Sequence, residues 1–166
     1  MCSGNGSNFE NIHHACPKHD IVIMVYNKKK AKARKRAENL NIPSCYSKDE
    51  DEIIALFNAY EVDMIGMAGW MKVVSKKFCD EFAGRIINLH PSLLPKYKGL
   101  HAVEQAMQAG EEETGCTVHF VNEYLDSGAI IKQQVVPILP GDTVESLTRA
   151  IQQAEHSLLP SVINAF

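Results

Sequence analysis

Asn88 and His90 stand two residues apart at the end of the apolar run "IINLHP", directly before Pro91. In an extended strand the side chains alternate between two faces, so Asn88 and His90 point to one side while Ile87 and Leu89 point to the other. Pro91 disfavours a helical conformation for His90 and cannot continue a sheet ladder, so the strand ends there. Two polar side chains projecting together can be catalytic, or they can be solvated residues at a strand end. This stretch alone leaves both interpretations open.

A glycine loop at the start of the chain, "SGNGSN", is a second candidate for chemistry. Its two glycines allow a close backbone approach to a ligand, and Ser7 with Glu10 fits the S-x-x-E capping box, which predicts a helix from about Asn8. Glycines followed by a helix N-terminus can bind an anion, and a phosphomonoester fits best. Phe9 stands where a dinucleotide fingerprint needs a third glycine, and no nucleotide P-loop lysine follows. The alternative is a plain turn before a helix.

Composition bounds the class of protein that could position these residues. The chain has 166 residues and a formal net charge of -3, which predicts one domain over 1–166 and gives no reason to expect nucleic acid or a membrane as a partner. Its five cysteines are far apart without a C-x-x-C pair, which suits free thiols in a reducing cytoplasm. No apolar run reaches the length of a membrane span, and the first residues lack a signal-peptide pattern. We therefore expect a cytoplasmic protein.

The order of apolar and amphipathic stretches predicts an α/β fold. Three continuous apolar runs, Asp20–Tyr26, Val62–Gly69 and Arg85–His90, are typical of strands covered on both faces. Helical patterns separate them. The remaining predicted elements are a helix over Asp49–Tyr60, strands over Thr114–Val121 and Ala129–Pro137, and a helix from Asp142 that Pro160 stops. Alternating strands and helices indicate a sheet that is mostly parallel in its first part.

A basic stretch follows the first predicted strand. Seven Lys or Arg residues fall between Lys28 and Arg36. They could attract phosphates, but acidic residues elsewhere balance the count and no aromatic side chains interleave to stack bases. We favour a solvated helix face.

Five segments together resemble one known family. "SGNGSN", "AGWMKVVS", "INLHPSLLPKYKG", "TGCTVHFVNEYLDSGAII" and "AEHSLLP" are similar in order and spacing to the phosphoribosylglycinamide (glycinamide ribonucleotide) formyltransferases, folate-dependent enzymes of de novo purine biosynthesis. The resemblance covers nearly the whole chain and is most specific from Asn88 to Ile131. It implies a three-layer, Rossmann-like α/β fold with a mostly parallel sheet flanked by helices.

In that family the amine of glycinamide ribonucleotide attacks the formyl carbon of 10-formyltetrahydrofolate, and the resemblance assigns catalysis to Asn88, His90 and Asp126. The chemistry agrees, because attack on a formyl group places negative charge on oxygen, which an amide N–H and a protonated imidazole can stabilise. A nearby Asp126 would favour the charged histidine and, as a further expectation, would position a water that carries the proton from the attacking amine. The resemblance requires no metal and no nucleophilic serine, and Ser92 lacks a G-x-S-x-G elbow.

The resemblance also implies binding residues. The substrate would be held by Gly6, Ser7 and Asn8 at its phosphate and by Gln152 and Glu155 at its ribose and glycinamide part. The folate would be held by Trp70, Met71, Lys72, Val73, Val74, Asn122 and Asp126, and His119 would lie beside the catalytic group. Taken individually, Glu155 looks like ordinary helix surface, Met71 and Val73 look like core residues, and His119 could be a hydrogen-bonded strand histidine.

The chain departs from the family pattern in several places. The family has an apolar strand directly before the serine of the glycine loop, whereas only Met1 and Cys2 precede Ser3 here, so we expect that the first strand is missing. The segment between residues 42 and 63 is short and lacks an arginine usual near the folate tail. Lys72 stands where arginine is usual, and the chain ends early. These departures concern folate affinity and stability.

Three alternatives stay open. Formyltetrahydrofolate deformylase and methionyl-tRNA formyltransferase share the N-x-H and aspartate pattern but use water or tRNA-bound methionine as acceptor, and the glycine loop argues against both. The third alternative is a non-catalytic ligand-binding remnant. The favoured interpretation predicts small-molecule substrates, no nucleic acid, no membrane, and a monomer or homodimer.

Overall fold

A computed structural model describes residues 1–166, that is, every residue of the chain. The elements are α1 (Ser7–Ala15), β1 (Met24–Tyr26), α2 (Ala33–Asn39), β2 (Ser44–Tyr46), α3 (Glu50–Ala59), β3 (Ile65–Ala68), α4 (Lys76–Glu81), β4 (Ile86–His90), α5 (Ala102–Gln108), β5 (Glu113–Phe120), β6 (Ile130–Pro137) and α6 (Val144–Ile163). None of these helices is long and apolar enough to span a membrane. The predicted α/β class is confirmed.

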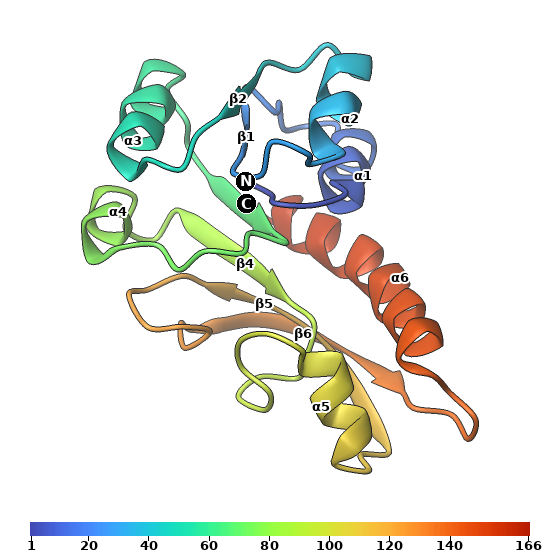
Figure 1. The fold of residues 1–166 in the computed structure, drawn as a ribbon. Coiled ribbons are helices and arrows are strands. Elements are labelled where there is room, and N and C mark those ends of the chain that lie inside the picture. Colours follow the sequence, from blue (N-terminus) through green and yellow to red (C-terminus); the bar gives the residue numbers. More distant parts are fainter.

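The strands form two sheets whose first pairings are parallel. β1 pairs with β2 in parallel, and the second sheet has the order β3-β4-β5-β6, in which β3 and β4 are parallel while β5 and β6 are antiparallel to their neighbours (Figure 1). The overall arrangement is therefore mixed, with the parallel part first, as the apolar runs predicted. The strands of the first runs are shorter than predicted, and β2 was not anticipated.

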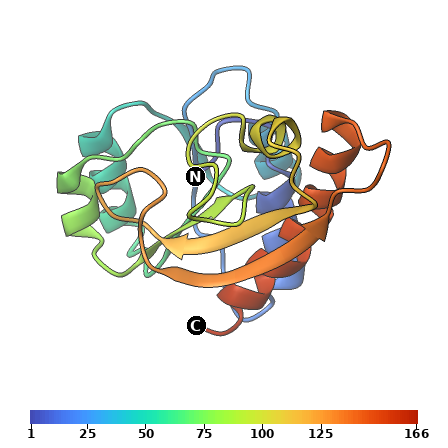
Figure 2. The same cartoon turned by 90° about the horizontal axis from the view of Figure 1, so that it is seen from below.

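Strand alternation in β4 sorts its side chains between two helix layers. Ile86 belongs to an apolar cluster with residues of α3 and α4, whereas Ile87 and Leu89 belong to a different cluster that α6 covers. α3 and α4 lie side by side in Figures 1 and 2, on the opposite side of the sheet from α6. Asn88 and His90 therefore point to the side of Ile86, at the end of the strand that α3 and α4 leave uncovered.

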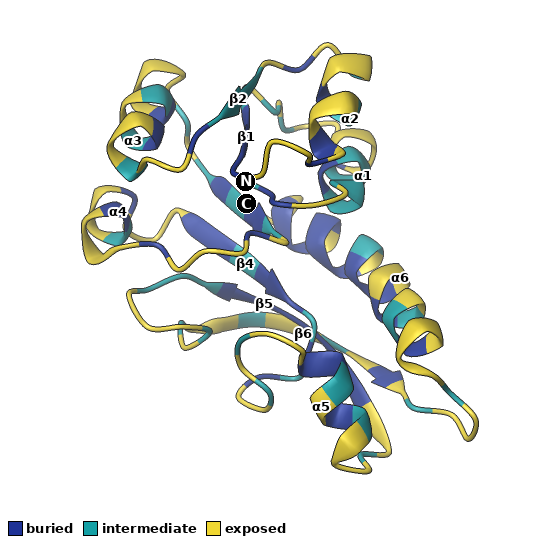
Figure 3. Ribbon diagram, viewed as in Figure 1, coloured by how far each residue is buried: buried dark blue, intermediate teal, exposed yellow.

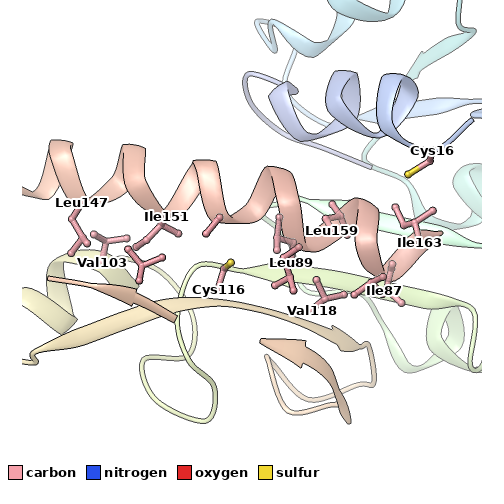
Figure 4. Packing of buried hydrophobic residues seen from close by; sticks show 14 residues of the cluster. Cys16, Ile87, Leu89, Val103, Cys116, Val118, Leu147, Ile151, Leu159 and Ile163 are labelled. Atoms are coloured by element: carbon pink, nitrogen blue, oxygen red, sulfur yellow. The ribbon is translucent and has the colours of Figure 1, made fainter. Parts of the chain in front are cut away.

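The long helix α6 supplies much of the core. Leu147, Ile151, Leu159 and Ile163 recur along one side of the helix and contact the sheet, which Figure 4 shows in detail. In Figure 3 the buried residues of α6 accordingly follow the side that faces the strands. Burial of each such side chain contributes about 1.5–3 kcal/mol. The helix begins with a capping box in which the Thr143 side chain accepts from the Ser146 N–H.

The prediction that Pro160 stops this helix was wrong, since α6 continues to Ile163. A proline inside a helix leaves the carbonyl four residues earlier without its N–H donor. Here that carbonyl belongs to His156, and the Asn11 side chain donates a hydrogen bond to it over 2.7 Å. A long-range contact from α1 therefore replaces the bond that proline removes, and the helix continues.

Met1 and Cys2 occupy a position between β1 and β3. The Cys2 N–H donates to the Val25 carbonyl, the Ala68 N–H donates to the Met1 carbonyl, and Cys2 forms an isolated parallel bridge with Tyr26. These bonds join the two sheets at this point. Beyond Met1 the gap between β1 and β3 is a cavity of about 450 Å³ lined mainly by apolar side chains. At the junction of the two sheets, Met1 and Cys2 thus take the place of a strand between β1 and β3.

Candidate active site

Asn88 of the catalytic prediction and His119, which was expected beside the catalytic group, are paired across the sheet. In the antiparallel register of β4 and β5, Asn88 lies opposite His119, and the Asn88 amide nitrogen is 3.2 Å from His119 Nε2. On its other side β5 pairs with β6, and that ladder shifts register between Val118 and His119, whereas the pairing of β5 with β4 is regular. A bulge of this kind re-aims side chains at the end of a paired region. Sheet pairing therefore places His119 beside Asn88, although 30 residues separate them in the chain.

His90 is buried and is held at both ring nitrogens. Its Nε2 lies 2.8 Å from the Tyr97 carbonyl oxygen, and its Nδ1 lies 3.3 Å from Asp126 Oδ2. A carbonyl oxygen can only accept a hydrogen bond, so Nε2 carries a proton. Both ring nitrogens of His90 therefore face oxygen acceptors, and the Asp126 carboxylate is the counter-charge of the ring whenever it is protonated.

Asp126 occupies a turn that directs its carboxylate inward. Its φ is 46°, in the left-handed region where aspartate is one of the few tolerated residues. The Gly99 N–H donates to Asp126 Oδ2 over 2.8 Å, and His119 Nε2 is 3.7 Å from Oδ1. Burial raises the pKa of Asp126. The contacts with His119 and Gly99 and the charge of His90 lower the pKa by more than burial raises it, so the net shift is downward. The carboxylate is therefore ionised at neutral pH.

His119 orients the amide of Asn88. Its Nδ1 lies 2.8 Å from the Phe120 carbonyl oxygen and must donate there, while its Nε2 lies between the Asn88 amide nitrogen at 3.2 Å and Asp126 Oδ1 at 3.7 Å. The Asn88 amide carries two hydrogens, so at least one of them remains available to a ligand. His119 is 2% exposed, so this contact is shielded from water. The sequence analysis offered two interpretations of His119, a residue beside the catalytic group or a hydrogen-bonded strand histidine. In the structure it is both hydrogen-bonded and adjacent to the cluster.

Sequence reasoning missed the backbone groups that complete the cluster. The Tyr97 carbonyl and the Gly99 N–H come from the loop after β4, where Tyr97 and Gly99 both have positive φ. Ser92 supports this loop, since its hydroxyl donates to the Lys96 carbonyl, and Thr117 donates to the Ser92 carbonyl. Contacts made by backbone groups cannot be inferred from residue types. The glycine of "KYKG" was the one local feature that favoured a turn here.

The glycine loop presents backbone donors without partners. The first main-chain bond of α1 runs from Glu10 N–H to the Gly6 carbonyl, and the N–H groups of residues 5–9 have no acceptor within the chain. The predicted capping box was wrong, because the N-cap is Gly6 with φ 75° and no side chain caps the helix. Glu10 instead forms an ion pair with Arg36. The uncapped helix start leaves its donors and its dipole free for an anion.

The loop is connected to α6 through Asn8 and Glu155. The Asn8 amide donates to Glu155 Oε2 over 3.0 Å, and Glu155 is only 8% exposed. Burial raises the pKa of Glu155, and the hydrogen bond from Asn8 offsets part of this shift. The interpretation of Glu155 as ordinary helix surface was therefore wrong. Gln152 lies one turn earlier on α6 and is exposed.

The segment expected at the folate divides into two parts. Trp70 and Val74 are buried in the cluster with α3 and α4, whereas Met71 and Val73 are exposed, at 58% and 54%. The interpretation of Met71 and Val73 as core residues was wrong.

The other side chains expected at the folate make backbone contacts. Lys72 is exposed and its Nζ donates to the Lys48 carbonyl. The Asn122 side chain accepts from the Tyr124 N–H in the turn that leads to Asp126.

The candidate groups gather at one edge of the molecule. Ser3 follows the parallel bridge of Cys2, and the segment after β3 follows a parallel strand. Together with the end of β4 they lie at the carboxyl ends of the parallel pairings, which is where ligands bind in open α/β sheets. The Ser3 hydroxyl accepts from the Met71 N–H, which ties the glycine loop to the segment after β3. The apolar cavity beside Met1 is not lined by Asn88, His90 or Asp126 and is a separate feature.

Comparison with known proteins accounts for this arrangement. The family model described as formyl transferase matches residues 1–163. The chain belongs to the formyl transferase family. A phosphoribosylglycinamide formyltransferase from Haemophilus influenzae is 40% identical to the chain over 179 residues, which cover 100% of the chain and 84% of that relative.

Other members of the family are longer or have known structures. The trifunctional purine biosynthetic protein adenosine-3 of Drosophila melanogaster is 43% identical over 178 residues, and the chain, covered to 98%, spans only 13% of its length. The crystal structure of a phosphoribosylglycinamide formyltransferase from Anaplasma phagocytophilum superimposes with a TM-score of 0.96 at 39% identity, covering 98% of the chain and 82% of that structure. The fold of the chain is therefore the formyl transferase fold.

Proposed function

We propose that the chain transfers the formyl group of 10-formyltetrahydrofolate to the amine of glycinamide ribonucleotide in de novo purine biosynthesis. The observation that carries the proposal is the cluster of Asn88, His90 and Asp126 at the same sheet edge as a glycine loop with free N–H groups. The names of the H. influenzae relative and the A. phagocytophilum structure support it. The same proposal predicts a cytoplasmic protein that acts on small molecules as a monomer or homodimer.

The reaction needs charge stabilisation at one oxygen and a route for one proton. The substrate amine attacks the formyl carbon, a C–N bond forms, and the carbonyl oxygen becomes negatively charged. The free amide hydrogen of Asn88 donates to that oxygen, and the positive charge of the His90 imidazolium, whose two N–H groups face Tyr97 and Asp126, stabilises it electrostatically. The amine then loses its proton, the bond from the formyl carbon to folate N10 breaks, and N10 takes up a proton. The products are the formylated ribonucleotide and tetrahydrofolate.

Asp126 acts on this sequence through its charge. Its carboxylate is ionised and lies 3.3 Å from His90 Nδ1, so it stabilises the charged imidazole. In this proposal it also holds the water that removes the proton of the amine, as the family resemblance implies. Removing a positioned acid-base group costs on the order of 10²–10⁴ in rate.

The acceptor binds at the glycine loop in this proposal. The N–H groups of Gly6, Ser7 and Asn8 donate to the phosphate, and this binding requires no charged side chain. Glu155, fixed by Asn8, accepts from the ribose hydroxyls or the glycinamide part, with Gln152 nearby on α6. A buried carboxylate with one hydrogen-bond donor can accept further hydrogen bonds, and the hydroxyl groups of a polyhydroxylated ligand can donate them.

Folate binds against the segment after β3 and the turn before Asp126. The exposed apolar side chains of Met71 and Val73 and the backbone around Lys72 would contact the pterin, while Trp70 and Val74 anchor the segment in the core. The turn that Asn122 begins would close around the ring. No group of three or more His, Cys, Asp or Glu residues is arranged to hold a metal ion.

One experiment separates the candidate acceptors. The purified protein is mixed with 10-formyltetrahydrofolate and with glycinamide ribonucleotide, methionyl-tRNA or water alone, and formation of tetrahydrofolate is followed. The proposal expects turnover only with glycinamide ribonucleotide, and a much lower kcat/KM for glycinamide riboside, which lacks the phosphate. Turnover with water or methionyl-tRNA would assign the chain to the deformylase or tRNA branch. Ligand binding without any turnover would indicate a non-catalytic remnant.

A further inference from the structure

Arg36 on α2 reaches across to the glycine loop. Its Nε donates to the Asn5 carbonyl over 2.9 Å, and its Nη2 lies 3.4 Å from the Asn5 side-chain oxygen. Its Nη1 forms the ion pair with Glu10 in the first turn of α1. The guanidinium thus joins α2, the loop and the helix start. Its neighbours in the basic stretch do not reach the loop in this way: Arg34, for example, is exposed and pairs with Glu38 on its own helix.

The same helix fixes a second carbonyl of the loop. The Ala33 N–H donates to the Gly4 carbonyl over 3.2 Å, so both the Gly4 and Asn5 carbonyls face α2. In a planar trans peptide the N–H of the next residue points opposite to the carbonyl. The N–H groups of Asn5 and Gly6 must therefore point away from α2. They join the free donors of the first turn of α1, which point out of the helix start.

Close packing removes the remaining freedom of the loop. Gly6 has φ 75°, and a Cβ at this position would lie 2.7 Å from the Ala33 Cβ. The loop therefore lies directly on α2 at Gly6, while Arg36 holds it at Asn5. Two peptide units have their direction set by one helix, and the donors are oriented before any ligand arrives.

We propose that Arg36 is a positioning residue for the acceptor's phosphate: it acts through Asn5 and Glu10 to aim backbone N–H groups, and it does not bind the phosphate itself. This inference rests on the proposed function. Because Glu10 neutralises the guanidinium, long-range attraction contributes little, and recognition depends on geometry. Preorganised donors avoid an ordering cost on binding, so loosening them weakens affinity without a change in the reacting groups.

The test compares Arg36→Gln, Arg36→Lys and the matched control Arg34→Gln from the same helix. For each variant, KM is measured for glycinamide ribonucleotide and for 10-formyltetrahydrofolate, together with kcat, Tm, and kcat/KM for the phosphate-free riboside. We expect Arg36→Gln to raise KM for the ribonucleotide about 10- to 100-fold, the range expected when a misaimed backbone N–H loses its hydrogen bond to the charged phosphate. The kcat, the folate KM and the riboside kcat/KM should stay close to those of the parent.

Arg36→Lys separates positioning from attraction. Lysine keeps the charge but lacks the planar fork that contacts Asn5 and Glu10 together, so its ribonucleotide KM should rise nearly as much as that of Arg36→Gln. A normal KM in Arg36→Lys, a normal KM in Arg36→Gln, or an equal rise for the riboside or folate would overturn the inference. Arg34→Gln should match the parent.

Failure of the proposed function is distinguished by a binding probe. Ribose 5-phosphate and ribose are titrated into each variant by calorimetry, which needs no turnover. If the parent lacks formyl transfer but binds ribose 5-phosphate more tightly than ribose, the proposed function fails, and Arg36 is still judged by the loss of that difference in Arg36→Gln. If the parent does not discriminate between the two sugars, the inference fails as well.

Discussion

Asp126→Asn removes one negative charge from the cluster of Asn88, His90 and Asp126, for which we propose a catalytic role, and changes little else. Asparagine has nearly the same shape, it tolerates the left-handed conformation of residue 126, and its side-chain oxygen can still accept from the Gly99 N–H. The variant should therefore fold. What it lacks is the carboxylate that faces His90.

The structure sets the size of the expected loss. Asp126 Oδ2 lies 3.3 Å from His90 Nδ1. Two unit charges at this separation attract by about 5 kcal/mol at an effective dielectric constant of about 20. Since about 1.4 kcal/mol corresponds to a factor of ten in rate, the full loss would be between 10³ and 10⁴, at the upper end of the 10²–10⁴ typical of positioned acid-base groups. We expect kcat to fall by at least about 10².

The assay measures formyl transfer and substrate affinity in the parent, Asp126→Asn and His90→Ala. Because the charge acts on the transition state more than on the bound substrate, kcat should fall while KM changes much less. Asp126→Asn and His90→Ala should lose similar factors if the two residues act as one unit. A folded Asp126→Asn variant with a near-normal rate would refute the reasoning and return Asp126 to the role of a turn residue that holds Gly99.

Three further predictions concern acceptor binding and stability. Gly6→Ala, which drives a Cβ into Ala33, should raise KM for the ribonucleotide strongly and leave the folate KM unchanged, whereas Gly4→Ala, with no neighbour within 4 Å, should match the parent in the same kinetic assay. Burial raises the pKa of Glu155, so the stability of the parent should decline as pH rises through that pKa. Glu155→Gln cannot ionise, so its Tm relative to that of the parent should rise from pH 4.5 to pH 8. A constant difference in Tm between the two proteins would contradict this. An apolar segment of about six residues added before Met1 should raise Tm, because it would fill the apolar cavity beside Met1, and a Gly-Ser segment of equal length should not.

Local rules in the sequence determined much of this protein. The alternation of side chains in an extended strand placed Asn88 and His90 on one face, and the end of that strand at Pro91 followed from backbone sterics. The order of apolar and amphipathic stretches was sufficient for the α/β class, since each element must bury one face. The resemblance of five segments to a known family indicated the formyl transferase family, which the family model confirms.

Contacts between distant segments were decided only by the tertiary structure. Glu155 became a buried partner of Asn8 because α6 packs beside α1, although the two lie 147 positions apart in the chain. His119 meets Asn88 through strand register, and a carbonyl freed by Pro160 finds its donor in Asn11.

The local signal at Glu10 was misleading for the same reason. Its carboxylate pairs with Arg36 instead of completing a capping box, because α2 lies within reach of the helix start. Hydrogen bonds and burial depend on which groups the topology brings within about 3 Å of each other, and periodicity along a single segment carries no information about that.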